Sequence, residues 1–172
     1  MDHRYLIAVP LPADSRDQLN ALYKSVTGED LAIDTMHLSL EFPFFLRHSR
    51  EDEFKARLRD IYLTTFPVEC VRLGVFHQKD KKMLYMKIQP AERFIDLHET
   101  IRREMSEYYT LDTSIYDNGI VPMYDPHLSL KYDLQYPEEM IKKLEDALRG
   151  FTFPAKNVAF YKELEKGVWE TV

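Results

Sequence analysis

The chain has 172 residues, enough for one ordinary domain with a hydrophobic core or for two small lobes around a shared cleft. Its net charge of -6 disfavours a long nucleic acid as ligand, because such binding depends on Lys and Arg contacts to phosphates, but it is compatible with a small nucleotide in a locally basic cleft. The single cysteine, Cys70, excludes an internal disulfide and a thiolate-rich metal site, and its apolar neighbours predict a buried thiol.

The first half of the chain alternates strand-like and helix-like segments. A short apolar run ends at Pro10, which cannot donate a backbone hydrogen bond to a sheet. Asp14 is placed to cap the helix that follows, and Gly28 comes just after the last apolar position of that helix. A longer apolar run comes next, and Ser49 then introduces a charged, helix-like segment. We therefore expect strands over residues 5–9 and 36–45, and helices over residues 14–26 and 51–66.

The second half begins with two strand-like runs joined by a charged loop, residues 78–82, an arrangement typical of a hairpin. Pro90 then opens a long amphipathic helix, whose buried stripe is expected to consist of Phe94, Leu97, Ile101, Met105 and Tyr108. Further strands are expected over residues 68–77, 83–89, 127–132, 153–162 and 167–172, with a helix over residues 137–148. Because strands joined by tight turns are interspersed with helices, the pattern favours an α+β fold with mostly antiparallel sheets over a doubly wound parallel sheet.

The sequence His-Leu-Ser-Leu occurs twice, beginning at His37 and again at His127. Each copy continues with a charged residue and then an aromatic residue, and each copy is strand-like. The two copies occupy similar places in the order of predicted elements. A match over six positions in similar surroundings indicates an internal duplication in which both copies serve one purpose.

Strand geometry predicts which side chains of each copy lie together, because successive side chains point to opposite faces. The polar faces are expected to carry His37, Ser39 and Glu41 in the first copy and His127, Ser129 and Lys131 in the second. The alternating apolar side chains, which include Phe42 and Tyr132, are expected in the core. Each polar face brings an imidazole and a hydroxyl to Cα positions roughly 7 Å apart.

If the two strands lie side by side across a pseudo-two-fold axis, the two histidines flank a pocket with two serines at its floor. In-line displacement at a phosphodiester needs a base for the entering oxygen and an acid for the leaving oxygen, and histidine can serve as either near neutral pH. The serines could donate hydrogen bonds to the non-bridging oxygens, and Lys131 could contact the phosphate. Tyr124, which precedes the second copy, is a candidate for stacking on a base.

Two other chemistries fit the sequence less well. A nucleophilic serine usually lies in a Gly-x-Ser-x-Gly turn, which the chain lacks. A zinc site usually needs a third protein ligand, and no His-Glu-x-x-His or cysteine cluster supplies one. We therefore expect neither a metal nor another cofactor.

Paired His-x-Ser/Thr motifs, one in each half of a chain of this size, resemble those of the 2H phosphoesterase superfamily. That superfamily includes bacterial ligase-like RNA phosphodiesterases and the cyclic nucleotide phosphodiesterases of plants and fungi. Residues 72–76 and 83–85 resemble the central hairpin of the ligase-like branch, whereas residues 124–130 and 169–172 are more similar to the plant enzymes.

The resemblance implies a single domain over residues 1–172 with a bilobal LigT-like fold, in which two pseudo-symmetric antiparallel β-sheet lobes with outer helices surround a central cleft. It also implies that the catalytic set consists of His37, Ser39, His127 and Ser129. The chain departs from the ligase-like branch at residues 43–45 and lacks the arginine that often follows the second motif there. Glu41 is unexpected beside an anionic substrate, and a salt bridge to Lys131 across the cleft is one interpretation.

These observations predict a metal-independent phosphodiesterase that opens the 2',3'-cyclic or ribose 1'',2''-cyclic phosphate of a small nucleotide. Cleavage of 2',5'-linked oligoadenylate or of signalling cyclic oligonucleotides is an alternative, and a non-catalytic nucleotide-binding module is another. The pseudo-symmetry leaves open which histidine is the base and which is the acid. No stretch approaches the roughly 18 apolar residues of a membrane span, and the first residues lack the layout of a signal peptide. We therefore expect a cytoplasmic monomer that binds a small nucleotide or a short oligonucleotide.

Overall fold

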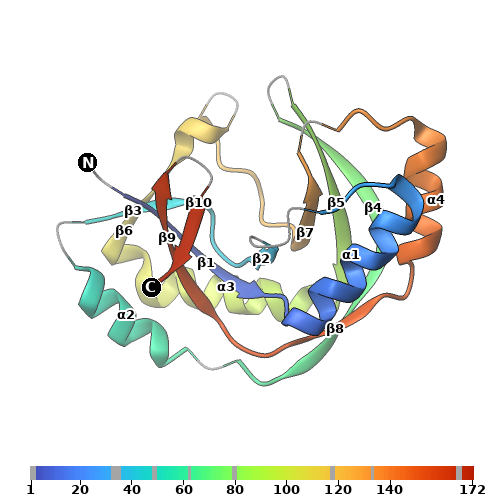
Figure 1. Ribbon diagram of the computed structural model, residues 1–172. Helices are drawn as coiled ribbons and strands as arrows, with labels where there is room; N and C mark the ends of the chain where they lie inside the picture. The colour runs from blue at the N-terminus through green and yellow to red at the C-terminus, as the bar shows by residue number, and fades with distance from the viewer. Residues whose placement is uncertain are drawn as a thin grey trace.

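The computed structural model describes residues 3–31, 36–47, 50–61, 63–78, 81–116, 119–132, 134–165 and 168–172. Within these ranges the chain forms ten strands and four α-helices (Figure 1). The strands are β1 (Arg4–Pro10), β2 (His37–Ser39), β3 (Phe44–Leu46), β4 (Phe66–Gln78), β5 (Lys81–Gln89), β6 (Tyr109–Leu111), β7 (His127–Lys131), β8 (Thr152–Ala155), β9 (Ala159–Glu165) and β10 (Val168–Thr171). The helices are α1 (Ala13–Thr27), α2 (Glu51–Arg59), α3 (Ala91–Met105) and α4 (Glu138–Leu148), and short 3-10 turns cover Ser106–Tyr108 and Thr113–Ile115.

All described strands belong to one antiparallel sheet with the order β10-β9-β1-β2-β7-β5-β4-β8, and β3 and β6 form a branch that joins β1. The order is symmetric about its centre, where β2 pairs with β7 through Leu38 and Leu128. In Figure 1 the two halves of the sheet rise as two arms, with β9 and β10 on one side and β4 and β5 on the other. The predicted α+β architecture with antiparallel sheets is therefore confirmed. The two motif strands are the elements at which its halves meet.

Helices cover the outside of both arms. Although α1 follows β1 in the chain, it packs beside α4, which lies against β4, whereas α2 and α3 pack against each other at the other half (Figure 1). Gly28 ends α1 in the left-handed conformation, with φ of 76°, as the sequence predicts. Asp14 is not the cap of α1, because Pro12 occupies that position and makes no side-chain hydrogen bond, so Asp14 lies in the first turn instead.

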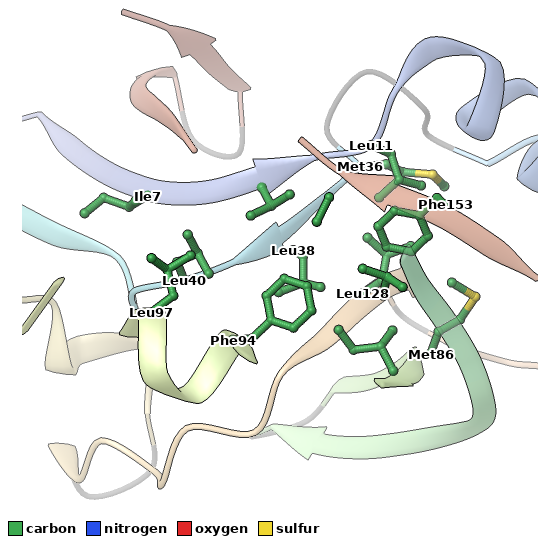
Figure 2. Packing of buried hydrophobic residues seen from close by; sticks show 14 of the residues in the cluster. Ile7, Leu11, Met36, Leu38, Leu40, Met86, Phe94, Leu97, Leu128 and Phe153 are labelled. Carbon is green, nitrogen blue, oxygen red and sulfur yellow. The ribbon is translucent and has the colours of Figure 1, made fainter. Parts of the chain in front are cut away.

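The leucines of both motifs lie at the centre of the hydrophobic core. Leu38, Leu40 and Leu128 are fully buried, and Figure 2 shows Phe94 and Leu97 of α3 beside the first two. This packing confirms the predicted apolar face of each copy. Full burial of one leucine contributes about 1.5–3 kcal/mol, so the pattern stabilises both strands in one orientation. The Cys70 thiol is buried as expected, and this burial raises its pKa to about 11.

Three predicted elements have different boundaries in the structure. The strand expected over 36–45 divides into β2 and β3, because Pro43 lies between them and lacks a backbone N–H. Helix α2 ends at Arg59, since β-branched residues and Pro67 follow and favour an extended chain. The strand expected over 153–162 divides into β8, which pairs with β4, and β9, which pairs with β1. Ser49 lies outside the described residues.

The aromatic residues after the two motifs do not both reach the core. Tyr132 is 60% exposed, so its predicted burial is wrong: β7 ends at Lys131 and its alternation ends with it. Phe42 is partly buried and packs edge-on against His98, Tyr116 and Tyr124. Tyr108, expected at the end of the α3 stripe, is buried but belongs to the 3-10 turn that follows the helix.

Candidate active site

The two motifs lie side by side in antiparallel order. Because Leu38 pairs with Leu128, the register brings His37 opposite Ser129 and Ser39 opposite His127. Directly opposite side chains have Cβ atoms about 5 Å apart, and diagonal neighbours such as the two histidines about 7–8 Å apart. All four side chains are half-buried on the face of the sheet that turns away from the leucine core. We refer to His37, Ser39, His127 and Ser129 as the His-Ser face.

The ring of His127 is oriented by the residue two positions before it. Its Nδ1 atom lies 2.7 Å from the carbonyl oxygen of Asp125. Because a carbonyl only accepts hydrogen bonds, Nδ1 carries the proton and donates, and Nε2 of the neutral ring is left with a lone pair. Burial lowers the pKa of His127 below its ordinary value of 6.5, and the charge of Lys87 acts in the same direction, while Asp125 opposes both. The arrangement favours a neutral imidazole near pH 7.

Phe76 and Tyr85 form an aromatic wall beside His127. Their rings stack with centroids 4.1 Å apart and planes 15° apart, and both meet the His127 ring edge-on, at 4.9 and 5.3 Å. Gly74 makes room for this arrangement, since a Cβ atom there would lie 2.3 Å from Cζ of Tyr85. The sequence pattern indicates these residues only as positions of a hairpin. Their place at the site follows from the pairing of β5 with β7, in which Tyr85 lies opposite Ser129.

His37 has different surroundings on the other half of the site. Its ring lies 5.6 Å from that of Tyr161 on β9, and Pro10 of β1 is its neighbour in the sheet. The two histidines are therefore related by the symmetry of the strand order but not by the residues around them. This difference gives a physical basis for assigning them different roles.

The hydroxyl of Ser129 has a weak protein partner. It donates to the Met83 sulfur at 3.3 Å, and a thioether is a poor acceptor, so a phosphate oxygen would be a better partner for it. The backbone carbonyl of Ser39 accepts a hydrogen bond of 2.8 Å from the Tyr124 hydroxyl. Both serines lie where their hydroxyls border the space between the histidines.

Two charged residues near the site are paired with acids. Lys131 donates to Glu29 at 2.7 Å, and its role as a phosphate ligand stays a prediction. Lys87, which no motif in the sequence indicates, lies opposite His127 on β5 and pairs with the Asp125 carboxylate at 3.3 Å. It therefore places a positive charge next to the candidate base.

Glu41 is not part of the His-Ser face. Its side chain is fully buried, accepts two hydrogen bonds from Arg102, at 3.0 and 3.2 Å, and accepts a third from the Tyr109 hydroxyl at 2.7 Å. The alternation that predicted its position stops at Ser39, where β2 ends, and the chain then turns toward α3. The interpretation of a salt bridge from Glu41 to Lys131 is wrong, since each residue has another partner.

Tyr124 lies in contact with the first motif. Its ring stacks on His98 at 4.1 Å with an angle of 11° between the planes, and Phe42 packs against it almost perpendicularly. The prediction that it stacks on a nucleotide base stays a prediction, and His98 already covers one face of its ring.

The described residues offer neither a metal cluster nor a membrane-spanning helix. Over the ranges that the structure describes, no group of three or more His, Cys, Asp or Glu side chains could hold a metal ion. No helix in these ranges is long and apolar enough to cross a membrane.

Comparisons with known proteins agree with this architecture. The family model described as the 2'-5' RNA ligase superfamily matches residues 11–167. The chain is similar in structure to E. coli LigT, with a TM-score of 0.69, 18% identity and coverage of 100% of this chain and 95% of that chain. TT0787 of Thermus thermophilus matches with a TM-score of 0.66 and 22% identity, over 98% and 94% of the two chains. Usb1 of Kluyveromyces marxianus, solved with uridine monophosphate, matches with a TM-score of 0.55 and 13% identity, over 99% and 97%. No curated protein sequence matches this chain.

Proposed function

Since the chain belongs to the 2'-5' RNA ligase superfamily, a group of 2H phosphoesterases, we propose that it is a metal-independent phosphodiesterase that opens the 2',3'-cyclic or ribose 1'',2''-cyclic phosphate of a small nucleotide. The observation that carries this proposal is the His-Ser face, on which each histidine lies opposite the serine of the other motif and the two histidines are diagonal neighbours. Small nucleotides are also the ligands named for related structures, namely 3'-AMP and ATP for LigT and uridine monophosphate for Usb1.

In the proposed reaction His127 is the base and His37 is the acid. Nε2 of His127 takes a proton from water while the water oxygen forms a bond to phosphorus. The bond between phosphorus and the ribose oxygen breaks on the opposite side, and His37 gives that oxygen its proton. The hydroxyls of Ser39 and Ser129 donate to the non-bridging oxygens as negative charge develops there. The carbonyl of Asp125 supports this assignment, because it holds His127 in the tautomer that a base needs.

The aromatic wall supports a ribose or a base as the group attached to the phosphate. Phe76 and Tyr85 present apolar surface directly beside His127, and aromatic side chains stack on bases with about 1–3 kcal/mol per base. A long nucleic acid stays disfavoured by the net charge of -6.

The test is hydrolysis of 2',3'-cyclic mononucleotides, a ribose 1'',2''-cyclic phosphate, 2',5'-oligoadenylate and cyclic dinucleotides, each with EDTA present. We expect turnover of the cyclic phosphates at an undiminished rate in EDTA. Loss of activity in EDTA would contradict the metal-independent mechanism. A preference for 2',5'-oligoadenylate or cyclic dinucleotides would replace the proposed substrate, and binding without turnover would identify a nucleotide-binding module.

The pH dependence tests the role of His127. Its pKa is lowered by burial, so the neutral form that can accept a proton persists below pH 6.5. We expect the acid limb of kcat/KM, where the rate falls because His127 becomes protonated, to lie below pH 6.5. In Lys87→Met this acid limb should move to higher pH, because the variant removes a charge that lowers the pKa of His127. Lys142→Met, a change at an exposed lysine of α4, is the matched control and should leave the profile in place.

A further inference from the structure

The backbone leaves the sheet immediately after Ser39. The N–H groups of Leu40 and Glu41 both donate to the carbonyl of Ile7, at 2.8 and 3.3 Å, and regular pairing of β2 with β1 ends there. Because one carbonyl serves two N–H groups, the ladder is irregular at this point, and the direction of the Ser39 hydroxyl also depends on the side chains that hold the residues that follow.

Side chains add further hydrogen bonds to this exit, beyond the two that the Ile7 carbonyl accepts. The Tyr124 hydroxyl donates to the carbonyl of Ser39 at 2.8 Å, and Nδ1 of His98 donates to the carbonyl of Leu40 at 2.7 Å. The Glu41 carboxylate accepts from the N–H of Phe42 at 2.8 Å. Side chains thus hold consecutive peptide groups, and two of these side chains, Tyr124 and His98, come from distant parts of the chain. The hydrogen bond from Tyr124 acts directly on Ser39, a residue of the His-Ser face.

Tyr124 belongs to the approach to the second motif. It is followed by Asp125, whose carbonyl orients His127, so one short segment holds Ser39 on one strand and His127 on the other. The strands themselves share one paired position, Leu38 with Leu128. The hydrogen bond from Tyr124 is therefore a second cross-link between the two halves of the site.

The position of the Tyr124 hydroxyl is itself defined by packing. The tyrosine ring stacks on His98, which is 5% exposed, and His98 lies one turn before Arg102 on the same face of α3. Arg102 in turn binds the buried carboxylate of Glu41. Helix α3 thus fixes both the strand exit and the ring that reaches back to it.

We propose that Tyr124 is a positioning residue that couples the two halves of the active site by holding the Ser39 peptide in register with His127. The expected effect on kcat rests on the proposed phosphodiesterase reaction. When the hydroxyl of Tyr124 is absent, the Ser39 peptide can rotate, and the Ser39 hydroxyl no longer meets the non-bridging oxygen in the transition state. The loss should fall on kcat more than on KM.

The test is a double-mutant cycle of Tyr124→Phe and Ser39→Ala. Tyr124→Phe keeps the ring on His98 and is expected to lower kcat about tenfold, with KM within about twofold of the wild type. If Tyr124 acts through Ser39, the double variant is no slower than Ser39→Ala alone. Tyr116→Phe is the matched control: its ring packs against the same Phe42, its hydroxyl makes no hydrogen bond within the described ranges, and kcat should not change. Independent, additive losses in the double variant would overturn the proposal.

Amide hydrogen exchange gives a second readout that needs no turnover. In Tyr124→Phe the amides of Leu40 and Glu41 should exchange about tenfold faster than in the wild type, because one hydrogen bond that holds the segment is lost. Unchanged exchange would overturn the coupling even if kcat fell. If the wild type opens no phosphodiester, the proposed function fails, whereas the exchange rates still decide whether Tyr124 holds the Ser39 segment.

Discussion

Replacing His127 by alanine is expected to lower kcat/KM for a cyclic phosphate about 10³-fold, because a positioned general base contributes roughly 10² to 10⁴ in rate. The substitution removes the Nε2 lone pair that Asp125 keeps available and leaves the paired Leu128 and the rest of β7 in place. The measurement is steady-state hydrolysis of a 2',3'-cyclic nucleotide near pH 7, with thermal unfolding measured on the same samples.

Two controls separate chemistry from folding in this experiment. His3→Ala changes an exposed histidine outside the His-Ser face and should leave kcat/KM unchanged. Added imidazole should restore part of the activity of His127→Ala, because a free base can enter the space left by the ring, and it should not affect the wild type. Activity within tenfold of the wild type in His127→Ala would rule out the two-histidine mechanism.

The central part of the site could be predicted because it depends on local pattern alone. In a strand the side chains alternate, so His37 and Ser39 had to share a face once Leu38 was buried, and the same holds for the second copy. The duplication then indicated that the strands belong together. Neither step requires knowledge of contacts between distant segments.

Glu41 shows where this reasoning stops. Its predicted place on the His-Ser face assumed that β2 continues, and the strand ends at Ser39 because Pro43 and the turn toward α3 follow. Lys131 keeps its place in β7, but its long side chain reaches Glu29. Partners of this kind come from elements far apart in the chain, and a local pattern contains no information about them.

The aromatic wall could not be predicted for a related reason. Tyr85 reaches Ser129 through the register of β5 with β7, and that register shifts at an irregularity between Leu84 and Tyr85. A shift of one residue would turn every following side chain to the other face. The alternation within β5 therefore leaves undecided which of its side chains border the site.

Among the single substitutions proposed, Glu41→Ala is expected to lower the free energy of unfolding most. Glu41→Ala removes the acceptor that the buried Tyr109 hydroxyl shares with Arg102, whose side chain is 40% exposed, so the tyrosine hydroxyl left without a partner should cost about 1–3 kcal/mol of unfolding free energy. Urea unfolding at neutral pH measures the loss. Glu139→Ala, at an exposed ion pair with Lys143, is the matched control and should unfold at the same urea concentration as the wild type.

The cause of that loss can be tested in the same system. Exchanging both partners of a buried hydrogen bond for apolar groups of similar shape is often nearly neutral, so the loss in Glu41→Ala comes from the donors left without an acceptor. The triple variant Glu41→Leu, Arg102→Leu and Tyr109→Phe removes these donors and should recover much of the loss. Glu41→Ala should also lower kcat, because the N–H of Phe42 loses its acceptor and the segment after Ser39 loosens. The triple variant should not recover this loss, since that acceptor is still missing. Recovery of both quantities together would mean that Glu41 affects the active site only through the stability of the core.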